Sequence, residues 1–359
     1  MINSAKINPD NVASSINSFN DWDPLEEVIV GSIENSFVPS IDDSFWSFQG
    51  AEYDLTKHVP GNVPRQLIDE TEEDIGGFVS LLEKFGVTVR RPAPIDFSRV
   101  VATPDWSTEG LHALMPRDSV LIVGQTVIEV PMACRARHFE GIAWRDILLS
   151  HLGSGMRWYS APRPRLLKGS YIVPSAPGGP RLNNLEPVFD AANILRIGED
   201  IFFSVNVSGN EMGARWLQDM LGSDYRVHLI SVCPDHVDTT LVPIGPGRLL
   251  VNPKRINPDN LPKQFRSWEI IYGPAEPPKL PYGLGDAWSS DWIGLNIFNI
   301  DENNIVVESG QTELIRILEK QPNLNVIPLP YRHSKTFGGG WHCITLDLRR
   351  RGALQNYCS

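Results

Sequence analysis

The sequence predicts an α/β protein built from repeated strand–helix–strand units. Three times along the chain, a segment with helical apolar spacing is followed, after a polar or glycine break, by a short β-rich stretch. Repeats of this kind can close radially, which protects sheet edges, whereas a doubly wound sheet is the competing architecture. No GxGxxG or Walker motif follows a predicted strand, so the sequence does not support nucleotide binding.

The first unit is expected near the N-terminus. Residues 25–33 form an apolar run entered through an Asp-Pro turn, which predicts a strand. Residues 37–64 are rich in Pro, Asp, Ser and aromatic residues, so we expect a long surface loop there. Residues 65–85 have helical apolar spacing and are followed by a glycine, and residues 87–92 then predict a strand.

Later units follow the same order. Residues 119–131 predict a hairpin, which precedes a helix at 137–151. We expect further strands at 201–207, 225–232, 304–307 and 324–329, and further helices at 212–222 and 312–320. The Pro- and Gly-rich stretches between these elements predict loops within one domain, residues 19–359, preceded by a flexible tail, residues 1–18.

The composition excludes several classes of protein. The 359 residues carry a formal net charge of -11, which argues against nucleic acid or an anionic membrane as the main partner. No apolar run is long enough to span a bilayer, and the 4 cysteines are widely spaced with no CxxC pair. This cysteine pattern is typical of a reduced cytoplasmic protein rather than of a disulfide scaffold or a zinc site.

A glycine-rich stretch at 338–352, GGGWHCITLDLRRRG, contains the first candidate for chemistry. Its three glycines lead into an alternating run, residues 343–348, which predicts a strand. Cys343 follows this glycine turn, where a ligand can approach closely, so it is a candidate nucleophile. In an extended chain His342 points to the opposite face, which makes it a poor base for Cys343. The alternative is that Cys343 is a buried, inert thiol.

A cysteine nucleophile needs a base, and the base needs an orienting group. His236 lies two residues before Asp238 at the start of a β-rich run, so their side chains share a face if the segment is extended. Asp118 directly precedes a predicted strand, and Asp190 follows a Pro-rich loop. Each of these residues also has an ordinary interpretation, as a surface or core histidine or as an aspartate that caps a turn.

Together these motifs resemble the L-arginine amidinotransferases, which are members of the guanidine-modifying (pentein) superfamily. The resemblance covers essentially residues 20–357, and its motifs occur in family order: MPRD at 115–118, EPVFDAAN at 186–193, HVDTT at 236–240, NPKR at 252–255, and GGGWHC with DLRRRG at 338–352. Residues 103–106, 161–166 and 208–218 look most like the inosamine-phosphate amidinotransferases. The resemblance implies a five-bladed α/β propeller with its site in a central channel.

The resemblance also implies a covalent reaction. Cys343 matches the nucleophile of the family, His236 matches its general acid/base, and Asp190 matches the carboxylate partner of that histidine. In this reaction the cysteine sulfur attacks the central carbon of the arginine guanidinium, and ornithine leaves. The acceptor amine then attacks the same carbon and takes up the amidino group. No metal or cofactor is implied.

Four further residues match substrate-binding positions of the family. Asp118 and Asp238 match carboxylates that bind the guanidinium, and Arg255 and Ser290 match residues that hold the α-carboxylate of arginine. Taken alone, Arg255 is equally a solvated surface charge and Ser290 a turn residue. The implied partners are L-arginine and a small amine, with a homodimer expected by analogy.

The acceptor amine is left open. We favour L-lysine, because it can reuse the clamp for the arginine carboxylate and the sequence has no phosphate-binding glycine loop. Asp235, in place of the apolar or hydroxyl residue expected before His236, is a candidate for attracting a cationic amine, or is simply solvated. The alternatives are an inosamine phosphate or glycine as acceptor, a deiminase that uses water, and a non-catalytic pentein that binds a macromolecule.

Overall fold

The structure, a computed structural model, describes residues 15–49, 58–172, 181–278 and 290–358. The strands in these ranges form five three-stranded sheets and two two-stranded sheets. In every three-stranded sheet the middle strand pairs antiparallel with one neighbour and parallel with the other. The described chain therefore contains five copies of one unit, an antiparallel pair joined by a crossover to a parallel strand.

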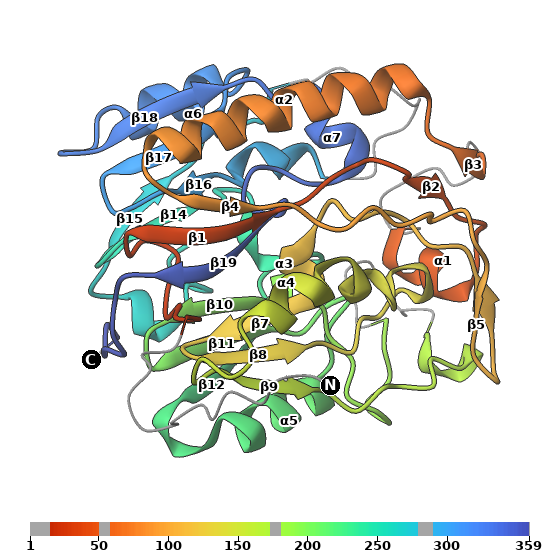
Figure 1. The fold of residues 1–359 in the computed structure, drawn as a ribbon. Helices are drawn as coiled ribbons and strands as arrows, with labels where there is room; N and C mark the ends of the chain where they lie inside the picture. The colour runs from red at the N-terminus through yellow and green to blue at the C-terminus, as the bar shows by residue number, and fades with distance from the viewer. Residues whose placement is uncertain (1–14, 50–57, 173–180, 279–289, 359) are drawn as a thin grey trace.

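The sheets use strands in chain order, except that the last strand joins the first. The three-stranded sheets are β19–β1–β4 (Thr345–Arg350, Leu25–Val30, Thr88–Arg90), β7–β8–β9 (Val120–Val123, Thr126–Glu129, Arg157–Ser160), β10–β11–β12 (Ile194–Ile197, Asp200–Ser204, Arg226–Ile230), β13–β14–β15 (Leu241–Gly245, Arg248–Val251, Glu269–Tyr272) and β16–β17–β18 (Phe298–Asn299, Asn304–Glu308, Asn325–Leu329). The two-stranded sheets are β2–β3 (Phe37–Val38, Gly61–Asn62) and β5–β6 (Val101–Ala102, Ser107–Thr108). Because β19 pairs with β1, the C-terminal strand completes the N-terminal unit (Figure 1).

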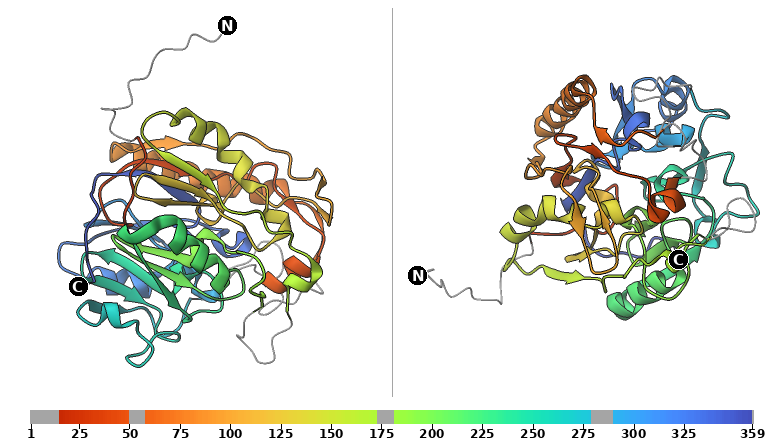
Figure 2. Two further views of the ribbon diagram at one scale, coloured as in Figure 1. Left: turned by 90° about the horizontal axis from the view of Figure 1, so that it is seen from below. Right: turned by 90° about the vertical axis from the view of Figure 1, so that its right-hand side faces the viewer.

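Helices form most of the crossovers. They are α2 (Arg65–Lys84) between β1 and β4, α4 (Arg145–Ser150) before β9, α5 (Glu211–Leu221) between β11 and β12, and α6 (Thr312–Leu318) between β17 and β18. The crossover from β14 to β15 has a 3-10 turn, η8 (Lys263–Phe265), in this place. Figure 2 shows the crossover helices on the outside of the molecule, with the strands between them and the interior.

The crossover helices follow their local sequence. Asn210 caps α5 by accepting a hydrogen bond from the Gly213 N–H at 2.8 Å, and Gly222 ends the helix with φ +73°. The spacing of Ile75, Phe78 and Leu82 places them on one face of α2, which packs against β1. Burying such a side chain stabilises the fold by about 1.5–3 kcal/mol.

The same core anchors the glycine-rich stretch. Trp341 is fully buried, and its ring stacks on Phe78 and on Tyr331 with 4.6 Å between ring centroids in each pair. Gly340 lies so close to Asn296 that a Cβ there would come within 2.7 Å of the asparagine side chain. The packing of Trp341 and the absence of a side chain at Gly340 therefore fix the turn that contains Cys343.

The predicted α/β class is confirmed, and most of the strands and helices listed from the sequence lie within a few residues of their predicted bounds. The described strands form separate sheets, none of which closes on itself, so the five-bladed propeller stays a prediction. The sheet β13–β14–β15 was not predicted as a unit, because its crossover lacks the helix that marks the other units.

Four local expectations need correction. The strand expected at 343–348 begins at Thr345, so Cys343 lies in a turn. The helix expected at 137–151 is divided into η3 (Glu140–Trp144) and α4, and the loop expected at 37–64 contains α1 (Asp43–Gln49). Residues 15–18, assigned to the tail, pack on the domain, since Ile16 is buried and the N–H of the next residue donates to the Leu348 carbonyl at 3.0 Å.

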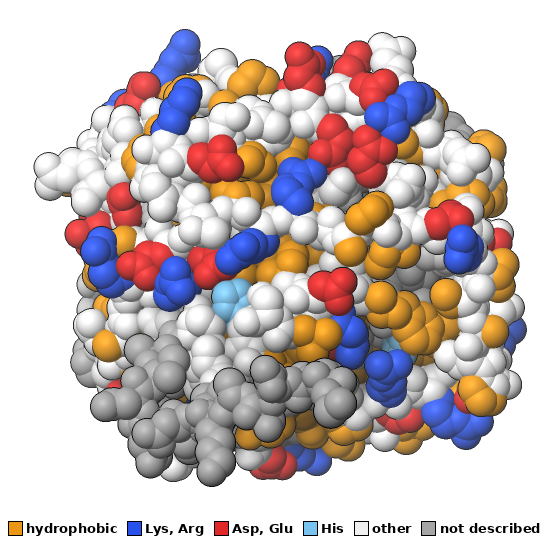
Figure 3. All heavy atoms as spheres, in the orientation of Figure 1, with side chains coloured by type: hydrophobic (Ala, Val, Ile, Leu, Met, Phe, Trp, Pro, Cys, Tyr) orange, Lys and Arg blue, Asp and Glu red, His pale blue; other side chains and the backbone are white. Residues whose placement is uncertain are grey.

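One face of the described surface carries charges of both signs (Figure 3). Figure 3 shows acidic and basic side chains interleaved over the face that carries β1, β4 and β19, with no large patch of one sign on its described part. Two of the ion pairs on these strands are Arg90 with Glu27 at 2.8 Å and Arg349 with Glu26 at 2.9 Å. No described helix combines the length and the apolar character needed to cross a bilayer.

Candidate active site

Five segments that directly precede the first strand of a sheet carry the candidate site. They hold Asp118 before β7, Asp190 before β10, Asp238 before β13, Asn296 before β16 and Cys343 before β19. The turns that contain or adjoin them are α3 (Pro116–Ser119), η5 (Ala191–Asn193), η7 (Val237–Thr239), η9 (Asp291–Leu295) and residues 341–344. Because α3 contacts η5 and β19, and η7 contacts η5 and η9, the five segments meet in one place.

His236 lies between two carboxylates. Its Nε2 is 3.1 Å from Asp190 Oδ2, and its Nδ1 is 3.9 Å from Asp118 Oδ1. Asp190 is fully buried, and its other oxygen accepts a hydrogen bond from the Ala133 N–H at 3.2 Å, which fixes its orientation. Burial favours the neutral ring, but Asp118 and Asp190 outweigh burial and raise the pKa of His236 to about 9. The ring is therefore an imidazolium at neutral pH and can act as an acid.

Asp118 is held through one oxygen only. Its Oδ2 accepts a hydrogen bond from Arg137 Nη1 at 2.8 Å, and Arg137 Nη2 is paired with Glu140 at 2.8 Å. Asp118 Oδ1 has no hydrogen-bond partner among the described residues, although the side chain is only 1% exposed. The His236 imidazolium is 3.9 Å from this oxygen, which is beyond hydrogen-bond distance.

Cys343 lies beside the second carboxylate. Its Sγ is 3.5 Å from Asp238 Oδ2, and its N–H donates to Asn296 Oδ1 at 2.9 Å. The ring of His342 reaches the same carboxylate, with Nδ1 2.9 Å from Asp238 Oδ2. Burial raises the pKa of the Cys343 thiol well above its usual range, and Asp238 and Asp118 raise it further. The sulfur is therefore a thiol here, and a cation bound between the carboxylates would lower its pKa.

Two buried carboxylates thus flank the site with one unsatisfied oxygen each. Asp238 Oδ1, like Asp118 Oδ1, is a buried acceptor that makes no hydrogen bond of normal geometry in the part of the chain that the structure describes, although the Asn296 amide is a donor close to Asp238. Buried polar atoms are normally hydrogen-bonded, so these two exceptions indicate a donor supplied by a ligand. A guanidinium has planar N–H donors and a permanent positive charge, which suit two such oxygens.

Arg255 and Ser290 lie together, as expected for a clamp, but Arg255 already has a carboxylate partner. Its Nη2 donates to Ser290 Oγ at 3.3 Å, and its Nη1 donates to Thr240 Oγ1 at 2.9 Å. Both nitrogens also donate to the Asp235 carboxylate, at 2.7 and 3.2 Å. Asp235 is therefore not simply solvated, and a substrate carboxylate would have to share Arg255 with it, while the contact of Asp235 with an incoming amine stays a prediction.

Two expectations about side-chain direction are wrong for one reason. The chain is not extended at either motif: residues 341–344 form a turn and η7 is helical. The turn brings the ring of His342 to Asp238 instead of directing it away from the site. In η7 the side chains of His236 and Asp238 diverge, so that His236 contacts Asp190 while Asp238 contacts His342 and Cys343.

Sequence reasoning also missed Asn296. A usable signal is its position, because Asn296, Asp118 and Cys343 each lie two residues before an apolar strand, at Phe298, Val120 and Thr345. Aligning the repeats on their first strands would have identified Asn296 as the fifth member of the site.

Known proteins of one activity are similar to this chain over almost its whole length. It is 49% identical over 348 residues to inosamine-phosphate amidinotransferase 1 of Streptomyces glaucescens, with 96% of this chain and 99% of that protein covered. The chain belongs to the amidinotransferase family. This amidinotransferase is also 36% identical over 355 residues to the L-arginine:L-lysine amidinotransferase of Pseudomonas savastanoi pv. phaseolicola, with 96% of the chain and 97% of that protein covered. No protein-family model matches the sequence.

Solved structures agree with the sequence comparison. The inosamine-phosphate amidinotransferase of Streptomyces griseus superposes on this amidinotransferase with a TM-score of 0.92 and 47% identity, covering 96% of this chain and 100% of that one. A dimethylarginine dimethylaminohydrolase superposes with a TM-score of 0.58 and 15% identity, covering 90% and 99%. At that identity the likeness concerns the fold alone, which is the pentein fold of the guanidine-modifying enzymes.

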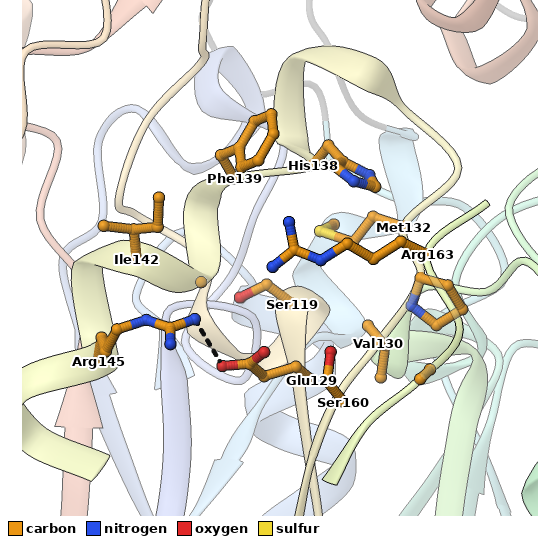
Figure 4. A pocket seen from close by; sticks show the side chains of 13 residues that line it. Ser119, Glu129, Val130, Met132, His138, Phe139, Ile142, Arg145, Ser160 and Arg163 are labelled. Carbon is orange, nitrogen blue, oxygen red and sulfur yellow. Dashed lines mark hydrogen bonds and ion pairs between the residues drawn. The ribbon is translucent and has the colours of Figure 1, made fainter. Parts of the chain in front are cut away.

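Other features of the amidinotransferase do not compete with this site. The described residues contain no group of three or more His, Cys, Asp or Glu that could hold a metal ion. A hollow lies beside η3 and β8, and it is lined by neither Cys343 nor His236 (Figure 4). Arg145 is engaged there with Glu129 at 2.9 Å, and the guanidinium of Arg163 lies 5.8 Å from the ring centroid of Phe139.

Proposed function

We propose that this amidinotransferase moves the amidino group of L-arginine, through a covalent adduct on Cys343, to the primary amine of an inosamine phosphate. The observation that carries the proposal is the pair of unsatisfied carboxylate oxygens, Asp118 Oδ1 and Asp238 Oδ1, beside a buried thiol. Two acceptors of this kind suit the donors of one guanidinium, and the sulfur beside them is suited to attack its central carbon.

Binding of the substrate prepares the nucleophile. The carboxylates that raise the pKa of the Cys343 thiol are those that take the guanidinium, so the bound cation offsets their effect. The thiol then loses its proton to solvent, and the thiolate attacks the guanidinium carbon to give a tetrahedral centre.

His236 supplies the proton for the leaving group. As an imidazolium with a pKa of about 9, it protonates the departing nitrogen, the bond between carbon and nitrogen breaks, and ornithine leaves. An amidino group remains on the Cys343 sulfur. The acceptor amine attacks that carbon, neutral His236 takes up the proton of the amine, and the thiolate leaves. Asp190 keeps the ring in place through both half-reactions.

One observation favours an inosamine phosphate as acceptor over lysine, which the sequence alone led us to prefer. The relatives named for inosamine phosphates are more similar to this chain than the relative named for lysine.

Lysine remains the second candidate for a specific reason. The contact of Arg255 with Ser290 forms a clamp that can hold the α-carboxylate of one amino acid after another, and a lysine acceptor would need no further subsite.

An acceptor screen tests the proposal. The protein is incubated with L-arginine and, in separate reactions, a phosphorylated inosamine, L-lysine, glycine or no acceptor, and ornithine, citrulline and amidinated products are measured by mass spectrometry. We expect ornithine and an amidino-inosamine phosphate. Citrulline as the main product would show hydrolysis instead of transfer. Homoarginine as the main product would identify lysine as the acceptor instead of an inosamine phosphate.

A pair of cysteine variants tests the covalent step. Cys343→Ala should abolish ornithine release and the arginine-dependent adduct, which intact-protein mass spectrometry detects on the unmodified protein. Cys134→Ala is the matched control, because Cys134 is equally buried but packs with Phe45 and Ala136 in a separate cluster. Turnover by the Cys343→Ala protein would exclude the mechanism.

A further inference from the structure

We propose that His342 is a positioning residue for this reaction: its charged ring holds Asp238 in place and makes the Cys343 sulfur easier to ionise. The inference rests on the proposed function and adds to it a residue that acts through Asp238 rather than on the substrate. Four observations carry it: the shared oxygen of Asp238, the second carboxylate on the far side of the ring, the fixed backbone of His342, and the charge balance around the sulfur.

One oxygen of Asp238 serves two neighbours. Asp238 Oδ2 lies 2.9 Å from His342 Nδ1 and 3.5 Å from Cys343 Sγ. The ring therefore occupies Oδ2 and leaves Oδ1 for the substrate, because Oδ1 has no hydrogen-bond partner among the residues described. Without the ring, the carboxylate could rotate and present either oxygen, and the geometry of guanidinium binding would be less well defined.

The far side of the ring faces a second carboxylate. His342 Nε2 lies 3.7 Å from Asp21 Oδ2, and Asp21 is itself held by Arg196 and by Arg117, the latter at 3.5 Å. With a carboxylate near each nitrogen, the ring is suited to carry a proton on both. Burial and the nearby charge of Arg117 disfavour that charge, but Asp21 and Asp238 outweigh them and raise the pKa of His342.

The backbone of His342 is fixed as well. Arg117 Nε donates to the His342 carbonyl oxygen at 2.8 Å, and the same side chain reaches Asp347 at 2.8 Å. A small cavity lined by His342, Asp21, Asp238 and Asn299 lies next to the ring. The ring thus contacts charged groups and an open space, which is not the environment of a histidine that only fills the core.

The charge balance explains what the ring does for the sulfur. Asp238 and Asp118 both raise the pKa of the Cys343 thiol, because they repel a thiolate. When the His342 ring is protonated, its charge lies beside Asp238, at 2.9 Å, and offsets part of that repulsion. Removing the charge of His342 while keeping a donor at Nδ1 should therefore make the thiolate harder to form, even if Asp238 keeps its position.

The test separates charge from hydrogen bonding. In His342→Asn, the amide nitrogen takes the place of Nδ1 and can donate to Asp238, but it carries no charge, and His342→Ala lacks both. The readout is the rate of ornithine release in a single turnover with L-arginine alone, measured from pH 6 to pH 10, because this half-reaction needs no acceptor. His228→Asn is the matched control, since His228 pairs with Asp200 at 2.6 Å on the edge strand β12.

We expect the pH profile of His342→Asn to move to higher pH by about 1 unit, which is about a tenfold slower release near neutral pH. His342→Ala should be slower still, and His228→Asn should follow the unmodified protein. A His342→Asn profile that coincides with that of the unmodified protein would overturn the proposal. If His342→Asn does not fold, as thermal unfolding would reveal, the profile of His342→Ala decides the question, because loss of the charge alone predicts the same shift to higher pH. Absence of ornithine release from the unmodified protein would instead count against the proposed function.

Discussion

Two groups of buried charges lie next to each other in this protein, and they are satisfied in different ways. The carboxylate pair, Asp118 and Asp238, keeps one oxygen of each side chain without a hydrogen-bond partner in the described structure. In the neighbouring arginine–aspartate network, each carboxylate is paired with two or more arginines. The network consists of Asp21 and Asp347 with Arg117, Arg196 and Arg350.

The network shows what buried charge looks like when it serves the fold. Asp347 is paired with Arg117 at 2.8 Å, with Arg350 at 2.8 Å and with Arg196 at 3.2 Å. Burial alone would raise the pKa of Asp347, but the three arginines lower it well below its usual range. These residues come from α3, β10 and β19, so the network joins three of the five units.

The carboxylate pair shows the opposite arrangement. Its charges are compensated by Arg137 and, at 3.9 Å, by His236 at Asp118, and by His342 at Asp238, but one oxygen of each carboxylate makes no hydrogen bond among the described residues. A buried charge left partly unsatisfied costs stability, and it persists where a ligand supplies the missing partner. From this difference we infer that the network holds the units together, whereas we propose that the pair binds the substrate.

The largest effect is expected from Asp118→Asn. The asparagine amide has no charge, and its N–H groups would face the N–H groups of the bound guanidinium. Losing one partner of a buried ion pair costs about 3–5 kcal/mol, so kcat/KM for arginine should fall by about 10³-fold. Steady-state kinetics measures the loss. The free energy of unfolding should change by less than about 1 kcal/mol, since Arg137 keeps Glu140. A large loss of stability with intact kinetics would place Asp118 in the same class as the network.

Asp347→Asn should have the reverse effect. It leaves Arg117, Arg196 and Arg350 without their common carboxylate, so the free energy of unfolding should fall by about 3 kcal/mol or more. Urea unfolding followed by fluorescence measures this change. An unfolding midpoint equal to that of the unmodified protein would show that the network does not join the units.

Asp190→Asn should change the pH dependence of catalysis. The carboxylates keep His236 protonated up to a pKa of about 9, so removing one of them lowers this pKa. The acid form is then lost at lower pH, and the alkaline limb of the rate should move down by about 1 unit, with about a threefold loss near pH 8.5 that approaches about tenfold above pH 10. An alkaline limb at the same pH in both proteins would contradict the role of Asp190.

The smallest effect is expected from Arg226→Ala, at a charge pair outside both groups. Arg226 donates to Asp200 at 2.7 Å but is 45% exposed, so solvent screens the pair. Stability should fall by less than about 1 kcal/mol, and ornithine release should be unchanged. A loss as large as that of Asp347→Asn would mean that burial does not distinguish the network from surface pairs.

Much of the fold followed from local sequence. The helices α2 and α5 could be predicted from apolar spacing and from the residues that end them, and the hairpin β7–β8 from its β-rich run. The sheet β13–β14–β15 could not be predicted in this way, because the crossover between the parallel strands β14 and β15 contains the short turn η8 and no α-helix. Parallel pairing joins distant residues, and a single sequence carries no direct signal for it.

The sequence by itself determined the α/β class, the family and the chemical types at the site, because these depend on residue identity and local spacing. Only the tertiary structure decided that His342 turns toward Asp238, that Asn296 supports the Cys343 backbone and that Arg255 is shared with Asp235. The physical reason is that each of these contacts depends on how a short turn directs a side chain, or on which segments from separate units meet. Neither is encoded in the periodicity of one segment.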